Sequence, residues 1–435
     1  MEESVYLQTV KKVANYLDVF QISEGNGIYW DISKSFQGDW DYYDTISLYA
    51  GSSGIIKFLI DLYNATGDKY YLDRAKKAGF HILNRLKISD EMIGRAFSKY
   101  AFTTGLGGVA FSLYKLYEVT GNKTFYSAAN KILHDIVSYD NGTGAWGGQI
   151  GITADSGTAL LLMQLADKFS IDGVKERLTS FGYYILSQQK IDEAGQIYYL
   201  GMELHYVNGP NGKFNSGFPL GPSGVAYTLL KLWDFTGEKA FLEGTDGISK
   251  FYHYHSIDDE KIFLPRLLPD ENHICYVGYC AGPVGTARYF YEGYLKTKEP
   301  HYLVDFENAI EGLKLVNAPY ERSEGFWEVD NYCCGTAGIL QLYIAAYMIT
   351  GKDEYLTRAI DTGNILIDRA TFEDNVAYWK QAFEQKNPEK ITVALGYYDG
   401  ISGIASSLLQ LDGLVNGKLN IVRFIDDPFP TKWEK

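Results

Sequence analysis

The sequence has no surplus of basic residues. Its 40 Lys and Arg are outnumbered by 54 Asp and Glu, which gives a formal net charge of −14 at pH 7. A generic nucleic-acid-binding protein needs a basic face, so this charge argues against that class. It also argues against binding to an anionic membrane surface, and it weakly favours a basic ligand or peptide.

A long apolar run is also missing. The chain begins with the acidic segment Met1-Glu2-Glu3-Ser4, and no long apolar stretch follows it. We therefore expect neither a signal peptide nor a membrane span, and we expect a cytoplasmic protein. With 46% hydrophobic and 22% charged residues, the chain is typical of a soluble globular protein. No interdomain linker is visible, so we expect residues 1–435 to form a single domain.

Cysteine is scarce. Four cysteines among 435 residues are too few for a disulfide scaffold. All four nevertheless fall in one window of the chain, at Cys275, Cys280, Cys333 and Cys334. In the reducing compartment that we expect for this protein, such clustering indicates metal or thiol chemistry.

What the sequence does contain is a short glycine step that occurs seven times. Each copy is a Gly-x-x-Gly-like pattern that opens an apolar run, and only the third departs from it, with Ala154 in the first position. The copies are Gly51–Gly54, Gly105–Gly108, Ala154–Gly157, Gly221–Gly224, Gly282–Gly285, Gly335–Gly338 and Gly400–Gly403.

The first copy shows what the repeat encodes. After Gly54 the apolar residues recur near helical spacing until Thr66-Gly67 supplies a stop signal. A second amphipathic run follows from Tyr70 to about Leu86. The Thr-Gly turn recurs after the second, fourth and sixth copies and is lost after the third, fifth and seventh. The repeat therefore predicts a helical hairpin.

Seven hairpins can form an open solenoid or a closed ring. A solenoid needs polar caps at its ends, whereas both terminal copies here keep an apolar glycine helix. The sequence therefore predicts an all-α double helical toroid, or α/α barrel, built from seven helical-hairpin repeats. The more apolar glycine helices are expected to form the inner ring and their partners the outer ring.

Two copies of the glycine step carry the cysteines. Cys280 lies two residues before Gly282, and Cys333 and Cys334 lie two and one residues before Gly335. Stacked repeats would bring these loop ends together at one rim of the ring. Three converging thiolates suit Zn²⁺, which prefers four ligands, so a fourth position would stay open for water or a substrate, as in a catalytic site.

Three other interpretations of the cysteines are open. They could be buried small hydrophobic residues. Cys275 could be a fourth ligand that closes a structural zinc site. Cys333 and Cys334 could form a strained vicinal disulfide. None of these explains why the cysteines adjoin the repeat glycines.

The chain resembles the lanthionine synthetase C-like (LanC-like) cyclase family along nearly its whole length. The resemblance rests on the seven-fold glycine-helix repeat, on Cys280-Ala281-Gly282-Pro283-Val284-Gly285 in the fifth copy, and on Cys333-Cys334-Gly335 in the sixth. It implies seven inner and seven outer helices around a zinc ion. It also implies that Cys280 and Cys333 are zinc ligands and that Cys334 replaces the usual histidine ligand, a three-cysteine variant that also occurs within the family.

The resemblance implies an activity as well. Family members add cysteine thiols of a dehydrated ribosomal precursor peptide to dehydroalanine or dehydrobutyrine, which closes the thioether rings of lanthipeptides. The peptide thiolate, held by zinc near neutral pH, adds to the β-carbon, and a proton donor serves the α-carbon. No kinase-like or dehydratase-like segment is visible in this sequence, so we expect a separate dehydratase as a partner.

Three positions depart from the family pattern. Leu220 stands in place of a histidine before the first glycine of the fourth repeat. Ala281 replaces the tyrosine of the usual Cys-Tyr-Gly, and Tyr276 stands where an arginine is often found. The metal site is therefore kept, whereas the usual acid–base set is lost.

Other residues near the same rim are candidates for the missing catalytic groups. We expect them among His205, before the fourth glycine step, His273 and Tyr276, before Cys280, and Asp330, before Cys333. Asp330 could instead orient the ligand pair. A water on a tris-thiolate zinc could also protonate the enolate without any side-chain acid.

Three functions compete. The first is a zinc-dependent LanC-like cyclase. The second is a diverged LanC-like zinc protein that binds a peptide or thiol as a scaffold without efficient cyclisation, which the loss of the histidine and the tyrosine favours. The third is a carbohydrate-active helical toroid with paired carboxylates near its centre, which gives no reason for three cysteines at the repeat glycines.

Overall fold

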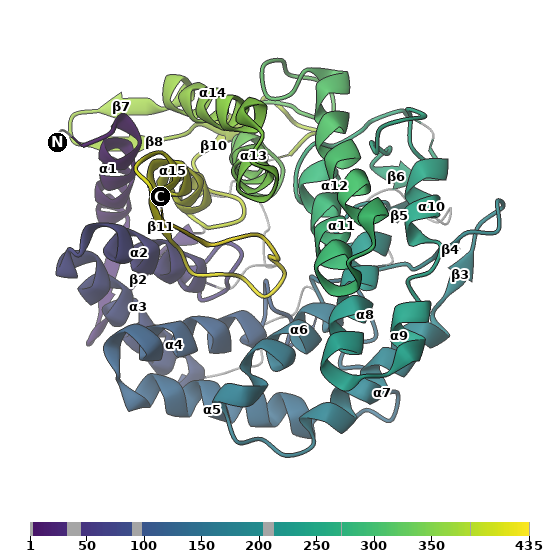
Figure 1. Ribbon diagram of the computed structural model, residues 1–435. Coiled ribbons are helices and arrows are strands. Elements are labelled where there is room, and N and C mark those ends of the chain that lie inside the picture. The colour runs from purple at the N-terminus through teal and green to yellow at the C-terminus, as the bar shows by residue number, and fades with distance from the viewer. Residues whose placement is uncertain are drawn as a thin grey trace.

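The computed structural model describes residues 3–32, 45–88, 98–202, 213–270, 272–382 and 384–434. Within these ranges the chain folds mainly into α-helices joined by loops and short two-stranded sheets. The helices form two concentric rings, so the predicted all-α toroid is confirmed (Figure 1).

The inner ring consists of the glycine helices. Each begins directly after the first glycine of a repeat, or after Ala154 in the third repeat, and most of its side chains are buried on every side because it packs against both the outer ring and the centre. The inner helices are α2 (Ser52–Thr66), α4 (Leu106–Thr120), α6 (Asp155–Leu165), α8 (Pro222–Thr236), α11 (Pro283–Thr297), α13 (Thr336–Thr350) and α15 (Ile401–Val415).

The outer ring consists of amphipathic helices with one buried face. Two short helices, α9 and α10, together take the fourth outer position. The outer helices are α1 (Val5–Val19), α3 (Lys69–Ile88), α5 (Lys123–Ser138), α7 (Val174–Ser187), α9 (Lys239–Glu243), α10 (Ile248–Tyr254), α12 (Pro300–Gly312) and α14 (Asp353–Arg369). The 3₁₀ segments Ala166–Lys168 and Leu313–Val316 extend α6 and α12.

The ring is closed by helices from opposite ends of the sequence. Helix α15 packs against α13 on one side and against α2 on the other, and its outer partner is α1 (Figure 1). The prediction of seven consecutive hairpins therefore needs one correction. The seventh inner helix pairs with the helix that precedes the first repeat, because no outer helix follows α15 in the described chain.

The predicted Thr-Gly turns are helix C-caps. Gly67, Gly121, Gly237 and Gly351 take the left-handed conformation, with φ between 67° and 81°. Each preceding threonine donates its hydroxyl to the carbonyl four residues back in its helix. In the fifth repeat Lys298 takes the same conformation, with φ 62°, so the turn persists without glycine at a steric cost of about 1–2 kcal/mol.

The strands form small antiparallel pairs in the segments that connect or follow the helices. The pairs are β1 (Gln21–Glu24) with β2 (Gly27–Trp30), β3 (Lys190–Ile191) with β4 (Ile197–Tyr198), β5 (Phe214–Asn215) with β6 (Leu267–Leu268), β7 (Thr371–Glu373) with β8 (Val376–Tyr378), β9 (Gln381–Ala382) with β10 (Ile391–Thr392), and β11 (Lys418–Asn420) with β12 (Lys432–Glu434).

The loops that lead into the inner helices form one rim of the ring. Backbone hydrogen bonds join equivalent residues of neighbouring repeats there. The amide of Cys333 donates to the carbonyl of Tyr398 at 2.8 Å, that of Tyr398 to Tyr49 at 3.0 Å, and that of Tyr49 to Thr103 at 2.8 Å. This ladder crosses from the last repeat to the first, which ties the rim shut.

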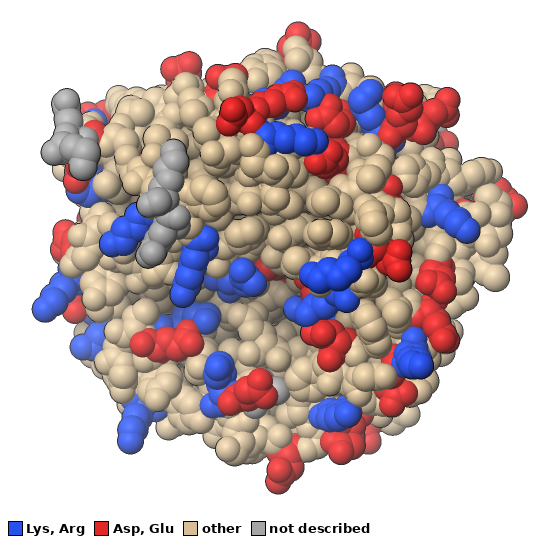
Figure 2. Space-filling view, viewed as in Figure 1, with Lys and Arg blue, Asp and Glu red and all other residues tan. Residues whose placement is uncertain are grey.

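Charges of both signs lie interspersed on the face shown in Figure 2, with several Lys and Arg side chains around its middle. The net charge of −14 is therefore not gathered into one acidic patch on this face.

Candidate metal centre

The cysteines lie in two neighbouring loops of the rim. The amide of Cys280 donates to the carbonyl of Cys333 at 3.2 Å, so the fifth and sixth repeats meet at these residues. Gly278 makes this approach possible, because a Cβ there would lie 2.5 Å from the Cα of Cys334. Helices α11 and α13 begin directly after Gly282 and Gly335, which turns the chain away from the cysteines.

The three predicted ligands converge. The Sγ atoms of Cys280, Cys333 and Cys334 all lie within 4.8 Å of one another, and those of Cys280 and Cys334 are 3.3 Å apart. Sulfur atoms bound tetrahedrally to zinc at about 2.3 Å are roughly 3.8 Å apart, so the donor set fits the metal. Cys333 is buried, whereas Cys280 and Cys334 keep exposed surface, which leaves the cluster accessible.

The three thiols shift one another's pKa values. Hydrogen bonds from Cys333 and Cys334 lower the pKa of Cys280 well below its usual value. The hydrogen bonds that Cys333 and Cys334 make to Cys280 raise their own pKa values well above the usual range. The protonation of each thiol therefore depends on the other two, and a cation bound among them would replace the shared protons.

Neighbouring repeats hold the ligand loops in place. The amide of Cys334 donates to Oδ1 of Asn331 at 2.8 Å, and Nδ2 of Asn331 donates to the carbonyl of Asp399 at 3.2 Å. A hydrogen bond from Tyr49 partly opposes the rise in the pKa of Cys333. Tyr49 was not among the residues that the sequence predicted for the site, although it occupies the same repeat position as Cys280 and Cys333, two residues before the first glycine.

Tyr276 lies beside the cluster. Cys280 and Cys334 pack against a small group of buried residues: Tyr276, Ala281, Trp327, Val329 and Ala382. Nη1 of Arg266 donates to the hydroxyl of Tyr276 at 2.9 Å. Burial raises the pKa of Tyr276, and the nearby Arg266 opposes this. The phenol is therefore protonated at neutral pH, and Arg266 is a second rim residue that sequence analysis did not find.

Asp330 is buried in an ion-pair network. Its Oδ1 accepts hydrogen bonds from Arg322 at 2.7 Å, Arg369 at 3.1 Å and the hydroxyl of Thr336 at 2.6 Å. These bonds connect the loop before Cys333 to the first turn of α13 and to the end of α14. The carboxylate of Asp330 therefore links this loop to both helices.

The other candidate residues lie elsewhere. His273 sits in a surface loop with its side chain 86% exposed, and its Nδ1 lies 2.6 Å from Oδ2 of Asp270. His205 falls outside the described residues. Cys275 does not join the cluster: burial raises the pKa of its thiol to about 12, and it packs in the apolar core.

Two alternatives for the cysteines can now be judged. All four are free, so a vicinal disulfide between Cys333 and Cys334 is not formed. The cluster contains three sulfur atoms without Cys275, so a metal bound by these three would have its fourth coordination position open. Ala281 is buried beside the cluster and Leu220 is half-buried. Both side chains are aliphatic, so neither departure from the family pattern supplies a proton donor.

Residues 42–419 match the family described as "Lanthionine synthetase C-like protein". The chain belongs to this family. The matched range of this LanC-like chain includes all the glycine steps and all the cysteines.

Several solved structures are similar to this LanC-like chain. Nisin cyclase is similar with a TM-score of 0.59 and 14% identity, over 86% of this chain and 89% of nisin cyclase. The Lin0763 protein from Listeria innocua matches with a TM-score of 0.48 and 13% identity, over 94% of this chain and 98% of that one. An α-1,6-mannanase from Salegentibacter sp. HEL1_6 matches with a TM-score of 0.46 and 12% identity, over 94% and 99%. The likeness to nisin cyclase, at 14% identity, shows the fold alone.

No curated protein sequence matches this LanC-like chain. In the part of the chain that the structure describes, none of the helices combines the length and apolarity that crossing a bilayer requires.

Proposed function

We propose that this LanC-like protein is a zinc-dependent thioether cyclase that acts on a dehydrated, ribosomally made peptide. The observation that carries the proposal is the convergence of three cysteine sulfurs within 4.8 Å of one another at the rim. Membership of the family and the likeness in fold to nisin cyclase support the same class of reaction. As the sequence predicts, the proposal includes a cytoplasmic location and a separate dehydratase that prepares the peptide.

Cys280, Cys333 and Cys334 would hold the zinc ion, which would supply a Lewis acid that lowers the pKa of a peptide thiol toward neutrality. The chain contributes three thiolates and no histidine to this site. The negative charge of a third thiolate, at Cys334, would leave a substrate sulfur at this site less neutralised and therefore more nucleophilic.

We assign the proton transfer to Tyr276. The peptide thiolate forms the new carbon–sulfur bond at the β-carbon, and the π electrons of the alkene pass to the enolate. The phenol of Tyr276 gives its proton to the α-carbon, and the guanidinium of Arg266, 2.9 Å away, stabilises the phenolate. The proton lost by the next substrate thiol restores the phenol. Tyr276 thereby takes over from the groups lost at Leu220 and Ala281.

A cyclisation assay tests the proposal. The probe is a synthetic peptide with one dehydroalanine and one cysteine, incubated with the zinc-loaded protein. Ring closure leaves the peptide mass unchanged but removes the thiol that iodoacetamide alkylates. We expect thiol loss with the wild type and with Cys275→Ala, and none above background with Cys280→Ala.

A failed assay would favour the scaffold alternative. If the protein holds zinc but thiols disappear no faster than without protein, the cyclase proposal is wrong for that peptide. The replacements Leu220 and Ala281 are the observation in favour of a protein that binds a peptide or thiol without cyclising it.

The carbohydrate-active alternative is not proposed. It requires a pair of accessible carboxylates near the centre of the ring. Asp426 and Asp427 lie there, but both are buried, and they are hydrogen-bonded to Tyr279 and Gln341 respectively.

A further inference from the structure

The segment that follows the family match enters the ring. The match ends at residue 419, within β11, and β11 pairs with β12 near the end of the chain. The intervening residues 421–431, which we call the C-terminal loop, cross the middle of the ring in Figure 1. Phe424, Ile425, Asp426, Asp427 and Phe429 of this loop are buried.

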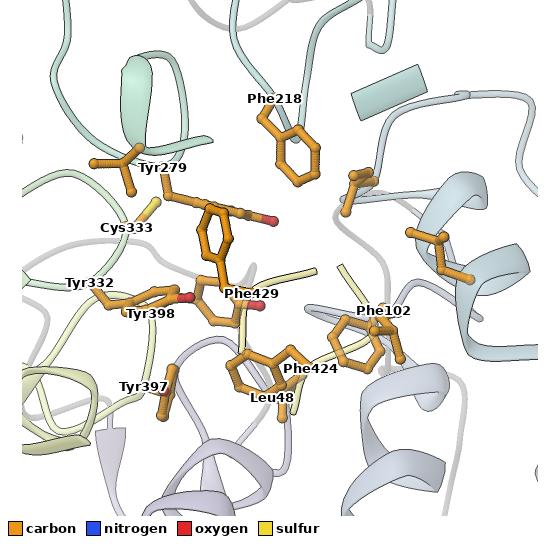
Figure 3. Packing of buried hydrophobic residues seen from close by; sticks show 14 of the residues in the cluster. Leu48, Phe102, Phe218, Tyr279, Tyr332, Cys333, Tyr397, Tyr398, Phe424 and Phe429 are labelled. Carbon is orange, nitrogen blue, oxygen red and sulfur yellow. The ribbon is translucent and has the colours of Figure 1, made fainter. Parts of the chain in front are cut away.

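Aromatic packing seats the C-terminal loop. The ring of Phe424 stacks on Tyr398 at 5.7 Å and meets Tyr397 edge-on at 4.9 Å. Phe429 lies 5.9 Å from Tyr291. Figure 3 shows Phe424 and Phe429 among the rings of Tyr397, Tyr398 and Tyr279.

Two carboxylates of the loop reach the residues that precede the zinc ligands. The hydroxyl of Tyr279 donates a short hydrogen bond to Oδ2 of Asp426, and Tyr279 directly precedes Cys280. Oδ2 of Asp427 accepts from Nε2 of Gln341 at 2.7 Å, and Oε1 of Gln341 accepts from the hydroxyl of Tyr332 at 3.0 Å. Tyr332 directly precedes Cys333.

The same carboxylates balance a buried cation. Arg288 is fully buried, and its hydrogen-bond partners are the neutral groups of Val284, Tyr332 and Gln341. Burial lowers the pKa of Arg288, but Tyr332, Asp427 and Asp426 outweigh this effect and raise it. A buried charge without a counter-charge is strongly unfavourable, so the two carboxylates of the C-terminal loop stabilise the guanidinium of Arg288 inside the ring.

We propose that the C-terminal loop positions the cysteine cluster, and that Asp426 is a positioning residue that acts through Tyr279 on Cys280. This inference rests on the proposed zinc site. Asp426 fixes the phenol of Tyr279, the phenol fixes the backbone of the ligand loop, and the loop fixes the direction of the Cys280 thiol. Groups that orient metal ligands in this way commonly change metal affinity by 10- to 100-fold when removed.

The test is metal binding by the full chain with Asp426→Asn and with Tyr279→Phe. Zinc affinity is measured by competition with a chromophoric chelator, and ligand geometry by the charge-transfer and d–d bands of the Co²⁺-substituted protein. Arg423→Gln is the matched control, because Arg423 is an exposed residue of the same loop. We expect about tenfold or greater weakening of zinc affinity and altered Co²⁺ bands in both test variants, with Arg423→Gln unchanged.

The double variant distinguishes one shared interaction from two independent ones. If Asp426 acts through Tyr279, the combined loss should equal that of either single variant. Wild-type affinity and bands in Tyr279→Phe would overturn the inference, even if Asp426→Asn fails to fold. A wild-type protein that binds neither metal would overturn the proposed zinc site itself, which is a different result.

Discussion

The amide of Cys280 donates a hydrogen bond to the carbonyl of Cys333 at 3.2 Å, across the boundary between the fifth and sixth repeats. This bond brings together two loops that lie more than 50 residues apart in the sequence. It places the sulfurs of the fifth repeat and of the sixth within reach of one cation, so the chemistry of the site depends on how the repeats stack.

Zinc content should follow the three clustered cysteines and not the fourth. Elemental analysis of the purified protein should give about one zinc per chain, retained in Cys275→Ala and lost in Cys280→Ala and Cys334→Ala. Zinc binding that is also lost in Cys275→Ala would indicate a closed structural site. If the wild-type protein contains no zinc, the cyclase proposal loses its metal, and the scaffold alternative remains only as a protein without zinc.

Adding a methyl group at Gly278 should disrupt the ligand loop. In Gly278→Ala the new Cβ would meet the backbone of Cys334 at 2.5 Å, so the loop must shift and zinc affinity should fall. The control is Gly67→Ala, where no neighbour lies within 4 Å but φ is +71°. It should lower the free energy of unfolding by about 1 kcal/mol and leave zinc binding unchanged. Equal zinc affinity in the two variants would contradict the prediction.

Removing the charge of Asp330 should destabilise the protein. Asp330→Asn removes the buried carboxylate that pairs with the partly exposed Arg322, so the free energy of unfolding should fall by about 2 kcal/mol in urea denaturation. Glu328→Gln is the control, because the side chain of Glu328 is 68% exposed and its Oε1 lies as far as 4.0 Å from Nε of Arg322. It should change stability by less than about 0.5 kcal/mol. A loss of turnover in Asp330→Asn at full stability would instead indicate a catalytic role.

The free energy of unfolding should decrease as the pH rises, because of Asp399. This carboxyl is fully buried, and neither oxygen has a hydrogen-bond partner among the described residues. Burial raises its pKa to about 8, from an ordinary value of 3.8. Between these pKa values the folded state holds a proton that the unfolded state releases. Each unit of pH rise in that window should therefore cost roughly 1.4 kcal/mol, with no further loss above about pH 8.

Asp399→Asn isolates this effect. The amide does not ionise, so the variant should gain stability relative to the wild type as the pH rises from 5 to 8, measured by denaturation at each pH. Asp259→Asn, on an exposed turn, should keep the pH dependence of the wild type. Parallel curves for the wild type and Asp399→Asn would show that the folded carboxyl ionises normally.

Removal of the phenol at Tyr276 should slow catalysis without releasing the metal. With zinc content unchanged, Tyr276→Phe should lower kcat by about 100-fold or more, since proton transfer from a positioned acid commonly contributes that much. Arg266→Met should give a smaller loss, because the phenol is kept while the phenolate is stabilised less. Unchanged turnover in Tyr276→Phe would leave the proton to a water at the site.

The sequence by itself determined the local features of this protein. The glycine steps set where each inner helix begins, and the Thr-Gly turns set where four of them end, because helix starts and C-caps depend on residues within one turn of each other. The placement of Cys280, Cys333 and Cys334 beside equivalent glycines was sufficient to predict that their loops converge. The repeat position of Tyr49 held a comparable signal.

Only the tertiary structure decided the remaining features. It paired α15 with α1, placed the C-terminal loop inside the ring, buried Asp399, and turned His273 toward solvent. The same structure engaged Asp330 with Arg322 and Arg369. These outcomes depend on contacts between residues far apart in the chain and on the exposure of single side chains. Both are set only when the ring closes, and no local pattern encodes them.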